Sequence, residues 1–156
     1  NPSYLRLTGS SNNPIVYNKD YKFEIGKSIT LKEGKDITIF CAGAMVSQCL
    51  KVAEILELKN ISSKVVNMHT IKPIDSESIN DACNFSKLIV SVEEHNIIGG
   101  LGTAIAERLA KNNKSPKLLT IGIDDQYSKG GSYKFLQEKH GLTSNQIVSK
   151  ILENLR

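Results

Sequence analysis

Residues Val92–Arg108 read "VEEHNIIGGLGTAIAER" and place two acids, one histidine and three glycines between two regular segments. The apolar run before them, Leu88–Val92, is rich in β-branched residues and predicts a buried strand. After the glycines, apolar residues recur with helical spacing, so we expect a helix over roughly Gly100–Lys111. The stretch therefore predicts a strand, a tight glycine turn and a helix.

The same order of apolar run and amphipathic segment repeats on both sides of this corner. Further strands are expected at Ile37–Cys41, Lys64–Met68 and Lys117–Ile123, with helices over Met45–Leu56, after an N-cap at Asp75, and twice more near the carboxyl end, the last from the capping box Thr143–Gln146. This β-α-β-α-β-α-β order predicts right-handed crossovers. We expect a three-layer α/β/α fold with a mostly parallel five-stranded sheet.

The first part of the chain is less regular. We expect a short strand at Tyr4–Leu7, a polar linker, and an antiparallel edge strand near Ile29–Leu31. The regular domain is expected to begin after residue 33. Residues 1–33 are thus assigned to a linker segment with the edge strand, and residues 34–156 to one compact domain.

Composition excludes several function classes. The 156 residues carry a formal net charge of +4, but the lysines are scattered, which argues against nucleic-acid binding. No apolar run approaches the roughly 20 residues of a membrane span. Three cysteines without C-x-x-C spacing indicate reduced thiols and a cytoplasmic protein. The three histidines lack ligand spacing, so no metal site is expected.

The glycine corner lies at the carboxyl end of a parallel strand, where open α/β sheets bind ligands. Amides at Gly100–Thr103 would hold an anion at the helix N-terminus. The dinucleotide pattern G-x-G-x-x-G is met only in part, because Ile105 stands at the third glycine position. Glycines for tight strand–helix packing are the competing interpretation.

An acid–base group is a further interpretation of the same corner. Glu93, Glu94 and His95 are adjacent, and histidine titrates near neutrality. Adjacent residues in an extended strand point to opposite faces, so Glu94 and His95 are not expected to face one substrate while the strand continues. We assign no catalytic residue.

Four segments together resemble the carboxyl-terminal domain of transketolase-like, thiamine-diphosphate-dependent enzymes. They are "DITIFCAGAMVSQCLKVAEIL" from Asp36, "VVNMHTIKPID" from Val65, the corner "VEEHNIIGGLGTAIAE", and "GIDDQYSKGGSYKFLQEKHGLT" from Gly122. The opening "NPSYLRLTG" is similar to the last strand of the pyrimidine-binding domain that precedes this one in the family. The sequence departs from the commonest final pattern at Asp124, where the family often has proline.

The resemblance implies an enzyme that transfers two-carbon ketol units between sugar phosphates. It implies that thiamine diphosphate and Mg are bound by other domains, since no Gly-Asp-Gly motif with a following Asn occurs here. This domain would support a homodimer and contact the cofactor-binding domains or subunit without catalysing alone. Arg6 would contact substrate, and an interface or anion site would include Glu94, His95, Gly99, Gly100 and Gly102.

Two alternatives remain open. One is a free-standing regulatory module that binds a nucleotide or another small anion at the glycine corner. The other is the same domain of a deoxyxylulose-phosphate synthase or of a 2-oxo-acid dehydrogenase beta subunit, which would keep the fold and change the substrate.

Overall fold

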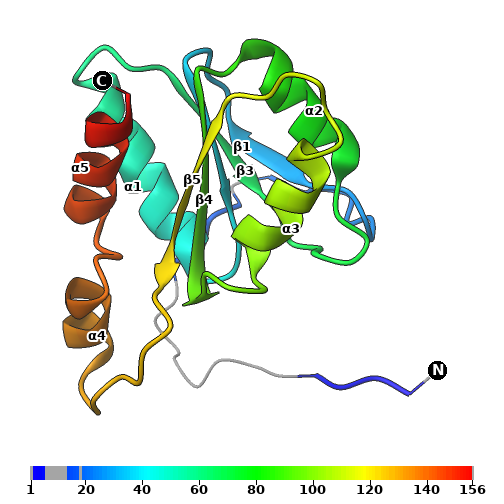
Figure 1. The fold of residues 1–156 in the computed structure, drawn as a ribbon. Coiled ribbons are helices and arrows are strands. Elements are labelled where there is room, and N and C mark those ends of the chain that lie inside the picture. Colours follow the sequence, from blue (N-terminus) through cyan, green and yellow to red (C-terminus); the bar gives the residue numbers. More distant parts are fainter. Residues whose placement is uncertain (1, 6–13, 18, 156) are drawn as a thin grey trace.

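The computed structural model describes residues 2–5, 14–17 and 19–155. Over these residues, five strands and five helices follow one another (Figure 1). The strands are β1 (Ile29–Lys32), β2 (Ile37–Cys41), β3 (Ser63–Asn67), β4 (Leu88–Asn96) and β5 (Lys117–Ile123). The helices are α1 (Met45–Glu57), α2 (Ser76–Phe85), α3 (Leu101–Leu109), α4 (Tyr133–Lys139) and α5 (Ser144–Asn154).

The sheet has the order β1-β3-β2-β4-β5. Strand β1 pairs antiparallel with β3, and the other neighbouring strands are parallel. This arrangement confirms the predicted five-stranded sheet with one antiparallel edge strand. The chain leaves β2 toward β3 and later returns to the other side of β2 with β4, so the direction of winding reverses between β2 and β4.

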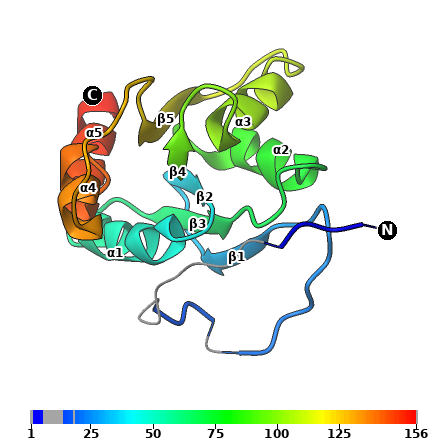
Figure 2. The ribbon, with the colours of Figure 1, turned by 90° about the horizontal axis from the view of Figure 1, so that it is seen from below.

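Helices cover both faces of the sheet. Figures 1 and 2 show α1 and α5 on one face and α2 and α3 on the other. Strand β4 serves both cores, because Val90 and Val92 pack on the side of α1 and α5 while Ile89 packs on the side of α2 and α3. The near-continuous apolar runs of the central strands are explained by this burial on both faces.

Two predicted helix starts are confirmed. The Asp75 side chain accepts a hydrogen bond from the Ser78 backbone nitrogen at 3.2 Å and caps α2. The Thr143 and Gln146 side chains form the capping box of α5. Both ends follow from short polar side chains that satisfy amides lacking a helical partner.

Four predicted boundaries are corrected by the structure. Strand β3 is Ser63–Asn67 rather than Lys64–Met68, because its pairing with β2 begins at Ser63. Strand β4 continues past Val92 because Asn96 still pairs with β5. Helix α3 ends at Leu109 rather than Lys111. Beyond its end, the Lys111 and Asn112 amides donate to carbonyls three residues back instead of four. Its N-cap is Gly100.

The fourth correction concerns the predicted first strand. Tyr4 and Leu5 are 90% and 81% exposed and form no strand, and the five-stranded sheet of the described residues does not include them. The rest of that prediction, Arg6 and Leu7, lies outside the described residues.

All three cysteines are free, with Cys41 and Cys49 buried and Cys83 partly buried. Burial raises the pKa of the Cys49 thiol well above its usual value, which keeps it protonated. Among the described residues, no helix has both the length and the apolar character needed to cross a membrane.

Candidate functional site

A crevice of about 360 Å³ opens at the carboxyl ends of β2 and β4, where the winding of the sheet reverses. This end of the sheet faces the viewer in Figure 2. Small ligands and partners in open α/β sheets bind at such reversal points. The crevice is lined by Ala42, Gly43, Ala44, Ile71, Glu93, Glu94, His95, Gly99, Gly100 and Leu101.

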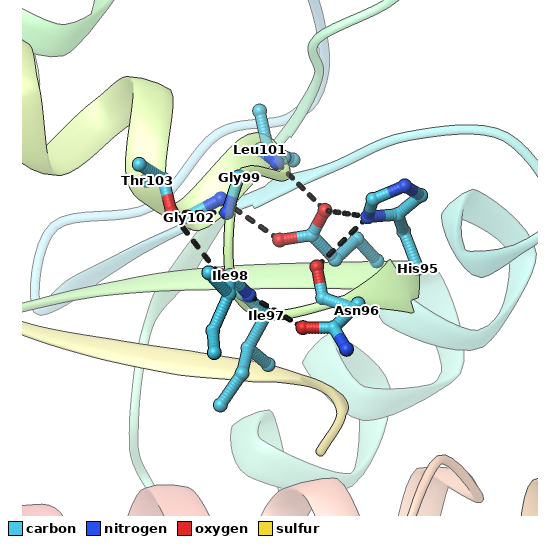
Figure 3. A network of polar contacts seen from close by, with 9 residues as sticks. His95, Asn96, Ile97, Ile98, Gly99, Leu101, Gly102 and Thr103 are labelled. Carbon is cyan, nitrogen blue, oxygen red and sulfur yellow. Dashed lines mark hydrogen bonds and ion pairs between the residues drawn. The ribbon is translucent and has the colours of Figure 1, made fainter. Parts of the chain in front are cut away.

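The Glu93 carboxylate forms the buried floor of this site. Its side chain is only 6% exposed. It accepts hydrogen bonds from the backbone nitrogens of Leu101 at 2.6 Å and Gly102 at 2.8 Å, and Figure 3 shows both amides directed at it. The N-cap Gly100 has no side chain to offer, so an acid from β4 caps α3 instead.

This contact bears directly on the expected anion site. The amides of Leu101 and Gly102 are among the groups expected to hold an external anion, and each donates to Glu93 in this structure. A negative charge at a helix N-terminus satisfies unpaired amides and the positive end of the helix dipole. The protein supplies that charge from its own strand.

Each corner glycine has its own steric reason. A Cβ on Gly100 would lie 2.0 Å from the Glu93 Oε2 atom, so only glycine admits the carboxylate. A Cβ on Gly102 would lie 2.7 Å from the Thr120 side chain, because α3 packs closely on the sheet. Gly99 has φ +78°, which favours glycine. These contacts support the interpretation of tight strand–helix packing.

The turn between β4 and α3 is held by its own polar groups. The Thr103 hydroxyl accepts from the Gly99 nitrogen at 3.0 Å and donates to the Ile97 carbonyl at 3.1 Å. The Asn96 side chain accepts from the Ile98 nitrogen at 2.8 Å. Figure 3 shows this second cluster beside the Glu93 contact, so the whole corner is fixed from within the chain.

The His95 ring is oriented by one hydrogen bond to the backbone. Its Nδ1 atom lies 2.8 Å from the Asn96 carbonyl oxygen and 4.0 Å from the Glu93 Oε2 atom. Because a carbonyl oxygen only accepts, Nδ1 carries the hydrogen of this bond, and in the tautomer protonated at Nδ1 alone Nε2 is an acceptor. The side chain is 65% exposed, and in Figure 3 the second ring nitrogen points away from the network.

Glu94 joins the crevice to the last part of the chain. Its Oε2 atom accepts from the Tyr133 hydroxyl at 3.3 Å, and the Gln137 amide donates to the same hydroxyl at 3.2 Å. Burial and the nearby Glu94 carboxylate raise the pKa of Tyr133 to about 12. Strand β4 thereby contacts α4, although this helix lies well beyond it in sequence.

The structure brings together most of the predicted site residues. Glu94, His95, Gly99 and Gly100 all line the crevice, whereas Gly102 is buried between α3 and the sheet. Glu94 and His95 both line the crevice although both lie within β4, and whether they face one substrate stays a prediction. The pairing of β4 with β5 is irregular between Val92 and Asn96, and the crevice spans the end of the strand.

Two points of the prediction remain, the residue Arg6 and the role of Glu93. Arg6 lies outside the described residues. Glu93 is predicted from the sequence as part of an acid–base group, and its role as a cap was missed. The sequence does hold a signal for this capping role. A helix that begins at glycine with no Ser, Thr, Asp or Asn just before it needs an acceptor from elsewhere in the chain.

A metal ion would need several ligating side chains close together. Within the described residues, no group of three or more His, Cys, Asp or Glu side chains is arranged to hold one. Glu93 and Glu94 are adjacent in sequence, but they contact different partners, the α3 amides and Tyr133.

Comparisons with known proteins agree with this geometry. A family model described as "Transketolase, C-terminal domain" matches residues 26–147. The chain is 40% identical over 156 residues to the "Putative transketolase C-terminal section" of Methanocaldococcus jannaschii, which covers 99% of this chain and 48% of that protein. It is 36% identical over 152 residues to an apulose-4-phosphate transketolase subunit of Actinobacillus succinogenes, covering 97% and 49%.

A solved structure described as "Split gene transketolase, inactive beta4 tetramer" is also similar. It matches with a TM-score of 0.82 and 37% identity, over 91% of this chain and 45% of that chain. This likeness confirms the predicted fold. The chain spans about half the length of the relatives that it matches.

Proposed function

Because this chain belongs to the transketolase C-terminal domain family, we propose that it is the carboxyl-terminal section of an enzyme that transfers two-carbon ketol units between sugar phosphates. Relatives named as transketolase subunits support this proposal. In it, the chain supports the assembled enzyme and contacts the cofactor-binding part, and it does not catalyse the reaction alone.

The observation that carries the proposal is the position of Glu93. A sugar phosphate or nucleotide phosphate would need the amides at the start of α3, and the Glu93 carboxylate already accepts from two of them. Displacing a buried carboxylate from its donors would leave it unpaired at a high cost in free energy. The corner therefore suits a fixed interface better than a phosphate-binding pocket.

The described residues do not fit thiamine diphosphate or Mg. A diphosphate with its metal needs clustered ligands for the metal, and residues 2–5, 14–17 and 19–155 hold no group of three or more His, Cys, Asp or Glu side chains that could bind one. At the glycine corner, the Leu101 and Gly102 amides that would meet a phosphate already donate to Glu93. We assign the cofactor and its metal to amino-terminal domains or to a separate subunit. Thiamine diphosphate would supply the carbanion chemistry there.

The proposal also assigns the parts of the chain. Residues 1–33 would comprise the end of a pyrimidine-binding domain, a linker and the edge strand β1, followed by the carboxyl-terminal domain. Arg6 would then reach toward a substrate phosphate. The complete enzyme would be a homodimer of such assemblies.

Reconstitution tests the proposal. The purified chain is mixed with a thiamine-diphosphate-binding transketolase subunit, and ketol transfer from a ketose phosphate to an aldose phosphate is followed. We expect turnover only from the mixture, with thiamine diphosphate and Mg present. Turnover by the chain alone would overturn the assignment, and so would a chain that neither binds nor activates the subunit.

Calorimetric titration separates this proposal from the regulatory module. We expect no saturable binding of nucleotides or sugar phosphates to the isolated chain. Gly102→Val is unsuitable as a probe of ligand binding, because a larger side chain there would push against Thr120 and disturb the packing of α3. Glu94→Gln is the better probe of ligand binding, because Glu94 lines the crevice at an exposed position.

A further inference from the structure

We propose that the crevice between the carboxyl ends of β2 and β4 receives an arginine side chain from the polypeptide that completes the enzyme. The inference rests on the proposed function and names the chemistry of the partner at this site. It is carried by the charge of the crevice, by two exposed acceptor side chains, Glu94 and His95, and by its apolar walls.

The charge of the crevice is opposite to that of the chain. The whole sequence has a formal net charge of +4, yet the residues that line the crevice include Glu93 and Glu94 and neither lysine nor arginine. The amino end of α1 also borders the crevice at Ala44, and it contributes about half a positive charge. The amino end of α3 borders it as well, at Gly100 and Leu101, and contributes a similar charge that Glu93 already meets. Two carboxylates outweigh both dipoles together, and the excess negative charge lies on Glu94, so a cation is favoured over an anion.

Glu94 and His95 provide the acceptors for the cation. Both Glu93 oxygens already accept from backbone amides, whereas Glu94 is exposed and uses one oxygen toward Tyr133. Nδ1 of His95 holds the hydrogen that faces Asn96, so Nε2 is a further acceptor in the tautomer protonated at Nδ1 alone. A guanidinium group has five donors in a plane and can serve both acceptors at once, which a lysine ammonium does less well.

The walls suit the rest of an arginine side chain. Ala42, Ala44, Ile71 and Leu101 give the crevice apolar sides that would cover the methylene groups. Ile98, in the turn between β4 and α3, is 67% exposed and adds apolar surface near this end of the domain. An arginine anchored in a pocket at the centre of a contact is a common source of binding energy between proteins.

The test uses the isolated chain and a small probe. N-acetyl-arginine amide is titrated into nitrogen-15-labelled protein, and the shifts of Glu94, His95 and Gly99 are followed by NMR. N-acetyl-citrulline amide is the matched probe, because it keeps the shape and loses the charge. We expect saturable shifts confined to the crevice residues with the arginine probe, and at least about tenfold weaker binding of citrulline, equivalent to about 1.4 kcal/mol.

Two variants assign the binding to the crevice. Glu94→Gln is expected to weaken arginine binding by about tenfold. Glu153→Gln on α5 removes the same charge from an exposed residue away from the crevice and should leave binding unchanged. Equal binding of the two probes, equal effects of the two variants, or the absence of saturable shifts would each overturn the proposal.

The outcome is distinguishable from failure of the proposed function. A chain that reconstitutes ketol transfer but does not bind the arginine probe overturns only the arginine site. A chain that binds arginine at Glu94 but neither binds nor activates a transketolase subunit overturns the proposed function and leaves a cation-binding crevice.

Discussion

The Glu93 carboxylate lies 2.6 Å from the backbone nitrogen of Leu101, eight positions later in the chain. This hydrogen bond joins the end of a central strand to the first turn of the helix that follows it. It also fixes the turn between them, because Gly100 must pass close to the carboxylate. The shape of the crevice therefore depends on a buried acid that is itself unavailable to a ligand.

Glu93→Gln is expected to destabilise the domain. The substitution keeps the size of the side chain but replaces one oxygen with an amide group that cannot accept from an α3 nitrogen. A buried donor would lose its charged partner, so the free energy of unfolding should fall by about 1–3 kcal/mol. Urea denaturation followed by circular dichroism measures the change.

The control for this prediction is Glu94→Gln. Glu94 is the next residue, but it is exposed and accepts a single long hydrogen bond from Tyr133. Its substitution should change stability by less than about 0.5 kcal/mol. Equal effects of the two substitutions would contradict the role of Glu93 as the cap of α3.

Gly100→Ala should be destabilising for a steric reason. The added methyl carbon would lie 2.0 Å from the Glu93 Oε2 atom and 2.8 Å from the Asn96 carbonyl oxygen, so the strand end or the turn must shift. We expect a loss of about 1–3 kcal/mol in thermal or urea unfolding. Gly130→Ala is the matched substitution, because nothing lies within 4 Å of its Cβ position. A loss of similar size at Gly130 would refute the steric account.

The architecture was predictable because its signals are local and repeated. The buried strands were found as apolar runs, and the cap at Asp75 and the box at Thr143–Gln146 were found from short polar patterns. The end of β4 was missed because the strand continues through the polar residues Glu93–Asn96, where the pairing with β5 is irregular and is found again only at Asn96, and these residues carry no strand signal in the sequence.

The candidate site was predictable only in part, since its contacts depend on tertiary structure. The family resemblance pointed to His95 and the glycine turn. The link between Glu94 and Tyr133 joins residues 39 positions apart, and no local pattern predicts it. Glu93 and Glu94 both line the crevice, but Glu93 accepts from the α3 amides and Glu94 from Tyr133, and these partners are set by tertiary packing.

Asp75 should make stability depend on acid pH. Its side chain is buried, which raises its pKa, but hydrogen bonds from Ser28 at 2.7 and 2.8 Å and from Ser78 at 3.2 Å outweigh this, and the net pKa is lowered. A lowered pKa in the folded state stabilises the protein above the unfolded value, near 3.9. This contribution is lost as the pH falls through the folded-state pKa.

Asp75→Asn tests that dependence. At pH 7 it should lower the free energy of unfolding by about 1 kcal/mol, because the charge that receives the Ser28 donors is removed. Below about pH 4 the difference from the natural sequence should narrow, because Asp75 takes up a proton first in the unfolded state and, at lower pH, in the folded state as well. Asp81→Asn, at an exposed position in α2, should have little effect at either pH. A difference that is constant from pH 7 to acid would contradict the assignment.

Tyr133 should ionise far later than a free tyrosine. Burial and the Glu94 carboxylate raise its pKa to about 12, so the neutral side chain stabilises the fold fully below pH 10. This stabilisation is lost as the pH rises from 10 toward 12. Ultraviolet absorbance of the phenolate should show a step near pH 12 that disappears in Tyr133→Phe and moves toward pH 10 in Glu94→Gln. Tyr127, whose side chain is fully exposed, supplies the control, because Tyr127→Phe should leave that step in place. A step unaffected by Glu94→Gln would show that the carboxylate does not act on Tyr133 in solution.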